Sequence, residues 1–152
     1  MNGDHAAFNA FNGGHWIPIK DGDLRAYALY QRHYSAHHYK TKRKRLFAGP
    51  GFKLCLMTVY CDALFVWRKF KSLDTQTGIS CAVFRNESDV LSSELIAEAM
   101  QRAWLRWPGE RLYTYVNAAK VQSKNPGYCF KVAGWKQCGL TQKRLLIFEA
   151  QA

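Results

Sequence analysis

The spacing of hydrophobic positions along the chain predicts two helices, and Asn, Pro and Gly residues mark the ends of a third. Apolar and aromatic residues recur at three- and four-residue steps over residues 24–39, which indicates an amphipathic helix. The same spacing over residues 95–107 predicts a second helix of four turns, with Ser92 or Ser93 as its N-cap. A third helix of about two turns is predicted from residues 125–134, ending at a glycine C-cap.

Between the helices, runs of β-branched and aromatic residues bounded by Gly, Pro and Asp predict short strands. They cover residues 15–20, 52–60, 63–70, 78–84, 111–116, 135–138 and 145–148. A tight turn at Cys61-Asp62 joins the second and third strands as a hairpin. The strand before the long helix and the strand after it form a βαβ unit. The predicted fold class is therefore α/β, as an α+β arrangement with a central mixed β-sheet flanked by helices.

The length of the chain limits its domain organisation. The chain has 152 residues, close to the size of one ordinary domain. Residues 1–14 are polar, contain glycine and show little periodicity, so we expect a loose N-terminal arm. Residues 15–152 then form a single domain. The arm has no secretory signal pattern, and no apolar stretch is long enough to cross a membrane. We therefore expect a soluble, cytoplasmic protein with no membrane partner.

Charge narrows the range of partners. Lys and Arg number 22 against 11 Asp and Glu, which gives a net charge of +11. The excess is spread over both halves of the chain, so nucleic acid is the first candidate partner and a merely soluble basic protein is the alternative. A dense basic run follows the tyrosines of the first helix and suits contact with a nucleic-acid backbone. It consists of Lys40, Lys42, Arg43, Lys44 and Arg45. Such runs are otherwise solvated surface.

Cysteine and histidine could supply metal or redox chemistry. The five cysteines are odd in number and form no C-x-x-C pair, so they indicate free thiols. His33 and His37 are four residues apart on the first predicted helix, a spacing that can bind a metal, and His38 lies beside them. The sequence identifies no third ligand. A neutral imidazole near pH 7 can also act as a base, or the histidines can belong to a helix that packs on the sheet.

The order of elements is similar to the acetyltransferase fold of the GNAT superfamily. The segment NPGYCFKVAGW at residues 125–135 resembles the superfamily's terminal segment, which holds the far arm of acyl-CoA. The resemblance implies an acyltransferase that uses acetyl-CoA or a related acyl-CoA. Ordinary members have a tyrosine four residues before the final glycine that protonates the leaving thiolate. Here Phe130 occupies that position, so Tyr128 would have to be turned inward to replace it.

A narrower resemblance is to the phage-encoded Mom-like proteins, which modify adenine in DNA at its exocyclic amine. It is carried, in order, by the segments RHYS at 32–35, FRN at 84–86, SSELI at 92–96, YTYVN at 113–117 and NPGYCF at 125–130. The family's functional positions would fall on His33, Tyr34, Asn117 and Tyr128, although the family usually has Asp where Asn117 stands. Members of this family have been associated with iron, so the resemblance brings iron into consideration as a second cofactor.

The resemblance also implies where acyl-CoA would bind. A strand leads into a helix N-terminus, where free backbone N–H groups and the helix dipole suit a pyrophosphate. The expected cofactor-binding residues are Phe84, Arg85, Asn86, Ser92, Ser93, Asn125 and Phe130. The glycine-rich loop of GNAT enzymes is absent, and Glu87 and Asp89 would repel phosphate if they pointed inward. A plain strand-to-helix connection with a serine cap is the alternative.

The resemblance implies a phage-type DNA modification enzyme that evades restriction by acylating the exocyclic amine of adenine, which must be flipped or single-stranded to reach an active site. His33 is the candidate base, the backbone after Cys81 the oxyanion donor and Tyr128 the leaving-group acid. Two other functions stay open. One is a conventional GNAT N-acetyltransferase that acts on a protein or small-molecule amine. The other is a non-catalytic basic module that binds nucleic acid.

Overall fold

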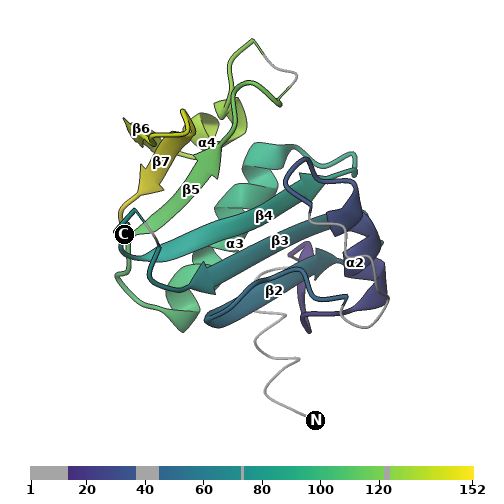
Figure 1. Ribbon diagram of the computed structural model, residues 1–152. Coiled ribbons are helices and arrows are strands. Elements are labelled where there is room, and N and C mark those ends of the chain that lie inside the picture. The colour runs from purple at the N-terminus through teal and green to yellow at the C-terminus, as the bar shows by residue number, and fades with distance from the viewer. Residues whose placement is uncertain (1–13, 37–44, 73, 122–123) are drawn as a thin grey trace.

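The protein folds around one seven-stranded β-sheet (Figure 1). A computed structural model describes residues 14–36, 45–72, 74–121 and 124–152. The strands are β1 (Trp16–Ile19), β2 (Phe52–Thr58), β3 (Ala63–Lys69), β4 (Ile79–Asn86), β5 (Leu112–Val116), β6 (Lys136–Leu140) and β7 (Leu146–Ala150). The helices are α2 (Leu24–Gln31), α3 (Ser92–Arg106) and α4 (Tyr128–Val132). The spatial order of the strands is β1-β2-β3-β4-β5-β7-β6.

The sheet is mixed, as the sequence predicts. β4 and β5 are parallel, whereas every other neighbouring pair is antiparallel. A parallel neighbour requires a crossover connection, and α3 provides it between β4 and β5. The predicted βαβ unit is therefore confirmed, and it is the only parallel junction among the described strands.

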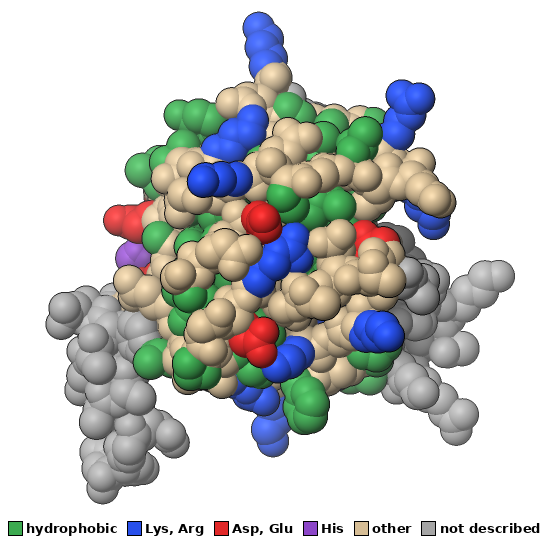
Figure 2. All heavy atoms as spheres, turned by 90° about the vertical axis from the view of Figure 1, so that its left-hand side faces the viewer, with side chains coloured by type: hydrophobic (Ala, Val, Ile, Leu, Met, Phe, Trp, Pro, Cys, Tyr) green, Lys and Arg blue, Asp and Glu red, His purple; other side chains and the backbone are tan. Residues whose placement is uncertain are grey.

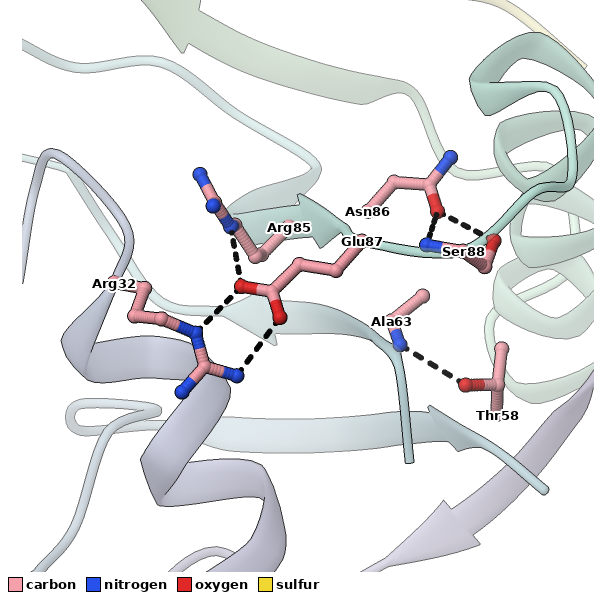
Figure 3. Close-up of polar contacts among 7 residues, drawn as sticks. All are labelled: Arg32, Thr58, Ala63, Arg85, Asn86, Glu87 and Ser88. Atoms are coloured by element: carbon pink, nitrogen blue, oxygen red, sulfur yellow. Dashed lines mark hydrogen bonds and ion pairs between the residues drawn. The ribbon is translucent and has the colours of Figure 1, made fainter. Parts of the chain in front are cut away.

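The β2–β3 hairpin has a longer turn than the sequence predicts. β2 ends at Thr58 instead of residue 60, because the Thr58 hydroxyl organises the turn. Its Oγ1 accepts the backbone N–H of Asp62 at 3.0 Å. It also accepts that of Ala63 at 2.9 Å, the bond drawn in Figure 3. Cys61 takes the left-handed conformation, with φ of 58°. These bonds end strand pairing two residues earlier than the apolar pattern suggests.

Two buried tryptophans fasten α3 to the sheet. The indole N–H of Trp16 donates to the carbonyl of Leu95 at 2.8 Å, and that of Trp67 donates to the carbonyl of Ala99 at 2.9 Å. Both rings and the facing side of α3 are fully buried in the larger core. The bonds satisfy indole donors that would otherwise be buried without a partner, so they fix the position of α3 along the sheet.

Helix α2 lies over the opposite face of the sheet and is shorter than predicted. It starts where expected, because Asp23 Oδ1 accepts the N–H groups of Arg25 and Ala26. It ends at Gln31 instead of residue 39, and residues 37–39 lie outside the described part. Just beyond that end, the Ser35 N–H donates to Nδ1 of His33 at 3.1 Å. Such local side-chain bonds compete with helix continuation.

The C-terminal elements agree with the prediction, with shifted boundaries. α4 has five residues and follows Gly127, whose φ is 78°. A Cβ at Gly127 would lie 2.5 Å from the Phe148 ring, so glycine is required both for its conformation and for its small size. The C-cap is Ala133, and the predicted cap Gly134 follows it with φ of 98°. β6 and β7 each begin one residue later and end two residues later than predicted.

The two faces of the sheet carry separate cores. The larger core lies between the sheet and α3 with α4, and the smaller lies between the sheet and α2. In Figure 1, α3 runs behind the sheet and α2 lies at its right-hand end. None of the helices within the described ranges has the length and apolar character that crossing a bilayer requires.

Candidate functional site: a cleft between β4 and β5

A cleft opens where the two parallel strands separate. β4 and β5 pair only from Ile79 with Leu112 to Cys81 with Thr114. β4 then continues to Asn86 and β5 to Val116, and the two strands diverge in Figure 1. The cleft has a volume of about 820 Å³. It lies between the diverging ends of these two strands, and we call it the β4–β5 cleft.

A bulge in β4 marks the start of the cleft. The register with β3 runs from Val66 opposite Val83 directly to Trp67 opposite Cys81. Ala82 is therefore left out of the pairing, on the strand that borders the cleft. β3 occupies the other edge of β4, so the backbone after Cys81 faces the cleft without a strand partner there. This is the backbone that the sequence analysis names as the oxyanion donor.

The wall of the cleft is basic and contains no carboxylate. Every residue that lines it belongs to the described part of the chain, and none is Asp or Glu. Four of them carry a positive charge: Arg32, Arg68, Arg85 and Lys120. The cleft therefore favours an anionic ligand. Phe84, Phe130 and Cys129 contribute apolar surface on the side of α3 and α4.

The structure brings three of the four predicted catalytic residues together at one end of this cleft. The rings of His33 and Tyr34 stack with centroids 4.4 Å apart. The Asn117 backbone N–H donates to the Tyr34 hydroxyl at 3.5 Å, and Asn117 directly follows β5. Tyr34 thus links the turn after α2 to the end of β5. His33 and Tyr34 were predicted to lie on a helix, and the structure corrects this, since both follow its end.

His33 is held as a neutral imidazole. Burial lowers the pKa of His33 to about 4; the nearby Arg85 charge also lowers it, and a hydrogen bond with the Phe84 backbone opposes them. Nδ1 accepts the Ser35 N–H and lies 2.7 Å from the Ser35 hydroxyl. The neutral ring therefore carries its proton on Nε2. Its basic lone pair is engaged by Ser35 in this structure.

Arg85 is part of an ion-pair cluster at the same end of the cleft (Figure 3). Glu87 receives two hydrogen bonds from Arg32, at 2.6 and 2.8 Å, and one from Arg85 Nε at 3.0 Å. The hydrogen bonds from Arg32 and then from Arg85 lower the pKa of the Glu87 carboxyl. One carboxylate thus serves two guanidinium groups. The cluster keeps a net positive charge, and it joins the turn after α2 to the end of β4.

The connection from β4 to α3 is organised by Asn86, and this corrects the predicted serine cap. Asn86 Oδ1 accepts the N–H and hydroxyl of Ser88, as Figure 3 shows, and its Nδ2 donates to Val90 O and to Ser92 Oγ. The helix cap is Leu91, which has no side chain able to accept a bond. Ser92 and Ser93 are the first two helical residues, and Ser92 contacts Asn86 instead of capping the helix.

The predicted cofactor-binding residues fall into two groups, those that line the cleft and those that do not. Phe84, Arg85, Asn86, Ser92 and Phe130 line the cleft, whereas Ser93 and Asn125 do not. Tyr128 also lies outside the lining, and its side chain is 59% exposed. Gly127 and Cys129, on either side of it, do line the cleft. The position of Tyr128 therefore gives no support to its proposed role as the leaving-group acid.

The predicted nucleic-acid surface lies mostly outside the described residues. This applies to Lys40, Lys42, Arg43 and Lys44, whereas Arg45 is described and partly exposed. Figure 2 shows one face of the molecule, on which Lys and Arg side chains are spread with Asp and Glu among them. On that face, positive charge is not gathered into a single patch.

The described residues do not fit the iron site that the resemblance implies. In the ranges that the structure covers, no three His, Cys, Asp or Glu side chains are grouped so that they could hold a metal ion. His37 and His38 lie outside these ranges. No chemical step is therefore assigned to iron.

Sequence reasoning missed several residues that line the cleft, above all Arg68, Ser80 and Tyr115. The Tyr115 hydroxyl donates to Asp74 at 2.7 Å, which leaves its ring as a wall of the cleft. Arg68 had one detectable signal, since it is a charged residue directly after the apolar run of β3.

No family model, curated protein or solved structure matches this chain.

Proposed function

We propose that this protein is a GNAT-like acyltransferase that uses an acyl-CoA to modify the exocyclic amine of adenine in DNA. The observation that carries the proposal is the separation of β4 from β5 beyond Cys81 and Thr114, which creates a cleft of about 820 Å³ at the only parallel junction of the described sheet. The unpaired β4 edge there can bond the amides of an extended pantetheine arm. The basic lining suits its phosphates and a nucleotide.

The exocyclic amine of adenine is a weak nucleophile because its lone pair is delocalised into the ring. An acyltransferase must therefore position the amine, remove its proton and stabilise the oxyanion that forms on the thioester carbonyl. The backbone N–H groups around the Ala82 bulge can stabilise this oxyanion. His33 is the proposed base, and it acts once the acceptor displaces Ser35 from Nδ1. Tyr34 positions the adenine ring.

The acceptor must reach the cleft outside a base-paired duplex. A stacked adenine cannot present its amine to an enclosed site, so the proposal requires a flipped base or single-stranded DNA. The exposed ring edge of Tyr34 and the basic segment of Lys40, Lys42, Arg43, Lys44 and Arg45 supply an aromatic surface and positive charge for such a strand.

Two measurements test the enzyme proposal. Calorimetry with acetyl-CoA should detect binding, and mass spectrometry should detect a modified adenosine in DNA from cells that express the protein. His33→Ala should abolish the modified nucleoside at matched soluble expression. His15→Ala is the control, because His15 lies outside the β4–β5 cleft, and it should leave the yield unchanged. Binding of acetyl-CoA without DNA modification would favour a conventional N-acetyltransferase.

A third measurement tests the DNA partner. Replacing Lys42, Arg43, Lys44 and Arg45 with Ser should flatten the log–log salt dependence of DNA affinity by up to about 0.9 for each phosphate that the variant no longer neutralises. An identical slope in the variant would place the DNA surface elsewhere. Salt-dependent DNA binding without acetyl-CoA binding would instead identify a non-catalytic nucleic-acid module.

A further inference from the structure

Arg68 lies in the β4–β5 cleft without an acidic partner. Its Nε is buried and has no hydrogen-bond partner, and no ion pair or side-chain hydrogen bond joins the guanidinium to any described residue. The other two arginines of the cleft differ, because Arg32 and Arg85 share Glu87. An arginine charge that lines a ligand-sized cleft without an acidic partner favours an anionic ligand.

The surroundings of Arg68 hold the guanidinium in place. Its carbon lies 5.6 Å from the centre of the Phe70 ring, and its Nη1 packs so close to Gly49 that a Cβ there would lie 2.2 Å away. Nε is buried against the protein, so the terminal nitrogens are the part of the guanidinium that a ligand in the cleft can reach. Terminal nitrogens of arginine donate charged hydrogen bonds to carboxylates and phosphates.

A hydroxyl lies beside the Arg68 side chain. Arg68 lies directly opposite Ser80 in the β3–β4 register, so both side chains emerge on the same face of the sheet. That face is the one covered by α2, because its neighbours along the two strands belong to the smaller core. Ser80 also lines the cleft, and its hydroxyl makes no side-chain hydrogen bond within the described part of the chain. The pair offers one charged and one neutral donor.

We propose that Arg68 and Ser80 form an oxyanion-binding subsite on the α2 side of the β4–β5 cleft, which recognises a phosphate or carboxylate carried by the acceptor substrate. The inference rests on the proposed acyl transfer only in calling this molecule the acceptor. His33 and Tyr34 line the same cleft, so the subsite would anchor the acceptor while its amine reaches the reacting end. The ligand then supplies the anionic partner that the Arg68 guanidinium lacks.

Nuclear magnetic resonance can observe the subsite directly through the Nε–H signal of Arg68, assigned by its absence in Arg68→Lys. We expect this signal to move with saturation when dAMP or acetate is added. The probe that moves the signal at the lower concentration shows whether the subsite prefers a phosphate or a carboxylate. Arg68→Met should weaken binding of that probe at least tenfold without loss of thermal stability, because it removes an unsatisfied donor. Arg106→Gln is the control, since Arg106 is exposed and lies outside the cleft.

Acetyl-CoA binding, measured in the same samples, separates this inference from the proposed function. Loss of dAMP or acetate binding in Arg68→Met with unchanged acetyl-CoA affinity would support an acceptor subsite. Absence of acetyl-CoA binding by the native chain would defeat the acyltransferase proposal, while the Arg68 signal would still decide the subsite. An Nε–H signal that neither probe moves, or equal probe affinity in Arg68→Met, would overturn the inference.

Discussion

The imidazole of His33 stacks on the ring of Tyr34, with centroids 4.4 Å apart and planes inclined by 28°. Adjacent residues on an α-helix point about 100° apart and cannot adopt this arrangement. It arises because α2 ends at Gln31, which frees the next residues to turn. The stacked pair is connected to β5 through the Asn117 backbone N–H, so the proposed base and the proposed ring-binding residue lie together at one end of the cleft.

The lowered pKa of His33 predicts a pH-dependent stability. The unfolded chain protonates this imidazole near its ordinary pKa of 6.5, whereas the folded chain does so only near a pKa of about 4. Between these values the unfolded state binds more protons, so its contribution makes the free energy of unfolding fall as the pH falls. His33→Gln should lose this part of the slope. Thermal melts of both proteins from pH 7 to pH 4 measure the difference.

A direct titration provides the check on that interpretation. The ring signals of His33, followed by nuclear magnetic resonance, should show a midpoint near pH 4. A midpoint near 6.5 would mean that the imidazole is hydrated in solution, and the pH dependence would need another source.

The stacked pair of His33 and Tyr34 also predicts which substitutions should reduce DNA modification most. His33→Ala should reduce the rate about 10²–10⁴-fold if it removes the base. Tyr34→Phe should have a milder effect, because it keeps the ring and removes only a long hydrogen bond of 3.5 Å with Asn117. Tyr34→Ala should be more severe than Tyr34→Phe. The yield of modified nucleoside at matched soluble expression gives the comparison, and full modification by His33→Ala would remove His33 as the base.

Gly127 offers a test of the wall formed by α4 and β7. Gly127→Ala places a methyl group 2.5 Å from the Phe148 ring at a φ of 78°, so it combines backbone strain with overpacking. Gly109→Ala is a matched control, with φ of 75° and no atom within 4 Å of the added carbon. The control should cost about 1–2 kcal/mol, and Gly127→Ala about 1–3 kcal/mol more. Urea unfolding measures both, and equal destabilisation would contradict the packing against Phe148.

The shared carboxylate of Glu87 predicts opposite effects of two substitutions on acyl-CoA binding. Arg85→Ala should weaken it by about 1–3 kcal/mol if Arg85 holds the pyrophosphate. Glu87→Gln should strengthen it and make it more sensitive to salt, because Arg32 and Arg85 lose their neutralising partner. Calorimetry at two salt concentrations tests both. Unchanged affinity in both variants would remove this cluster from the cofactor site.

The elements and their order follow from the amino-acid sequence. Hydrophobic spacing, β-branched runs, and turn and cap residues together located every described strand and helix, and the βαβ unit followed from one long amphipathic helix between two apolar strands. Charge counting anticipated a basic protein. These features depend on neighbouring residues in the chain, where spacing and turn residues act directly. The predicted placement of Asn117 directly after a strand was correct for the same reason.

Three features depend on side-chain contacts that hydrophobic spacing does not report: where α2 ends, what caps α3 and which residues line the cleft. The end of α2 depends on bonds of His33 with Ser35 and of Arg32 with Glu87, a residue 55 positions away. The cap of α3 was decided by Asn86, which contacts the Ser92 hydroxyl. Arg68 enters the cleft because of its register with Ser80, and its lack of an acidic partner is a property of three-dimensional surroundings. The bond of Arg32 with Glu87 and the register of Arg68 with Ser80 join distant parts of the chain, so local sequence patterns cannot show them. The bonds of Ser35 and Asn86 are local, but which side-chain atoms bond there depends on how the backbone turns.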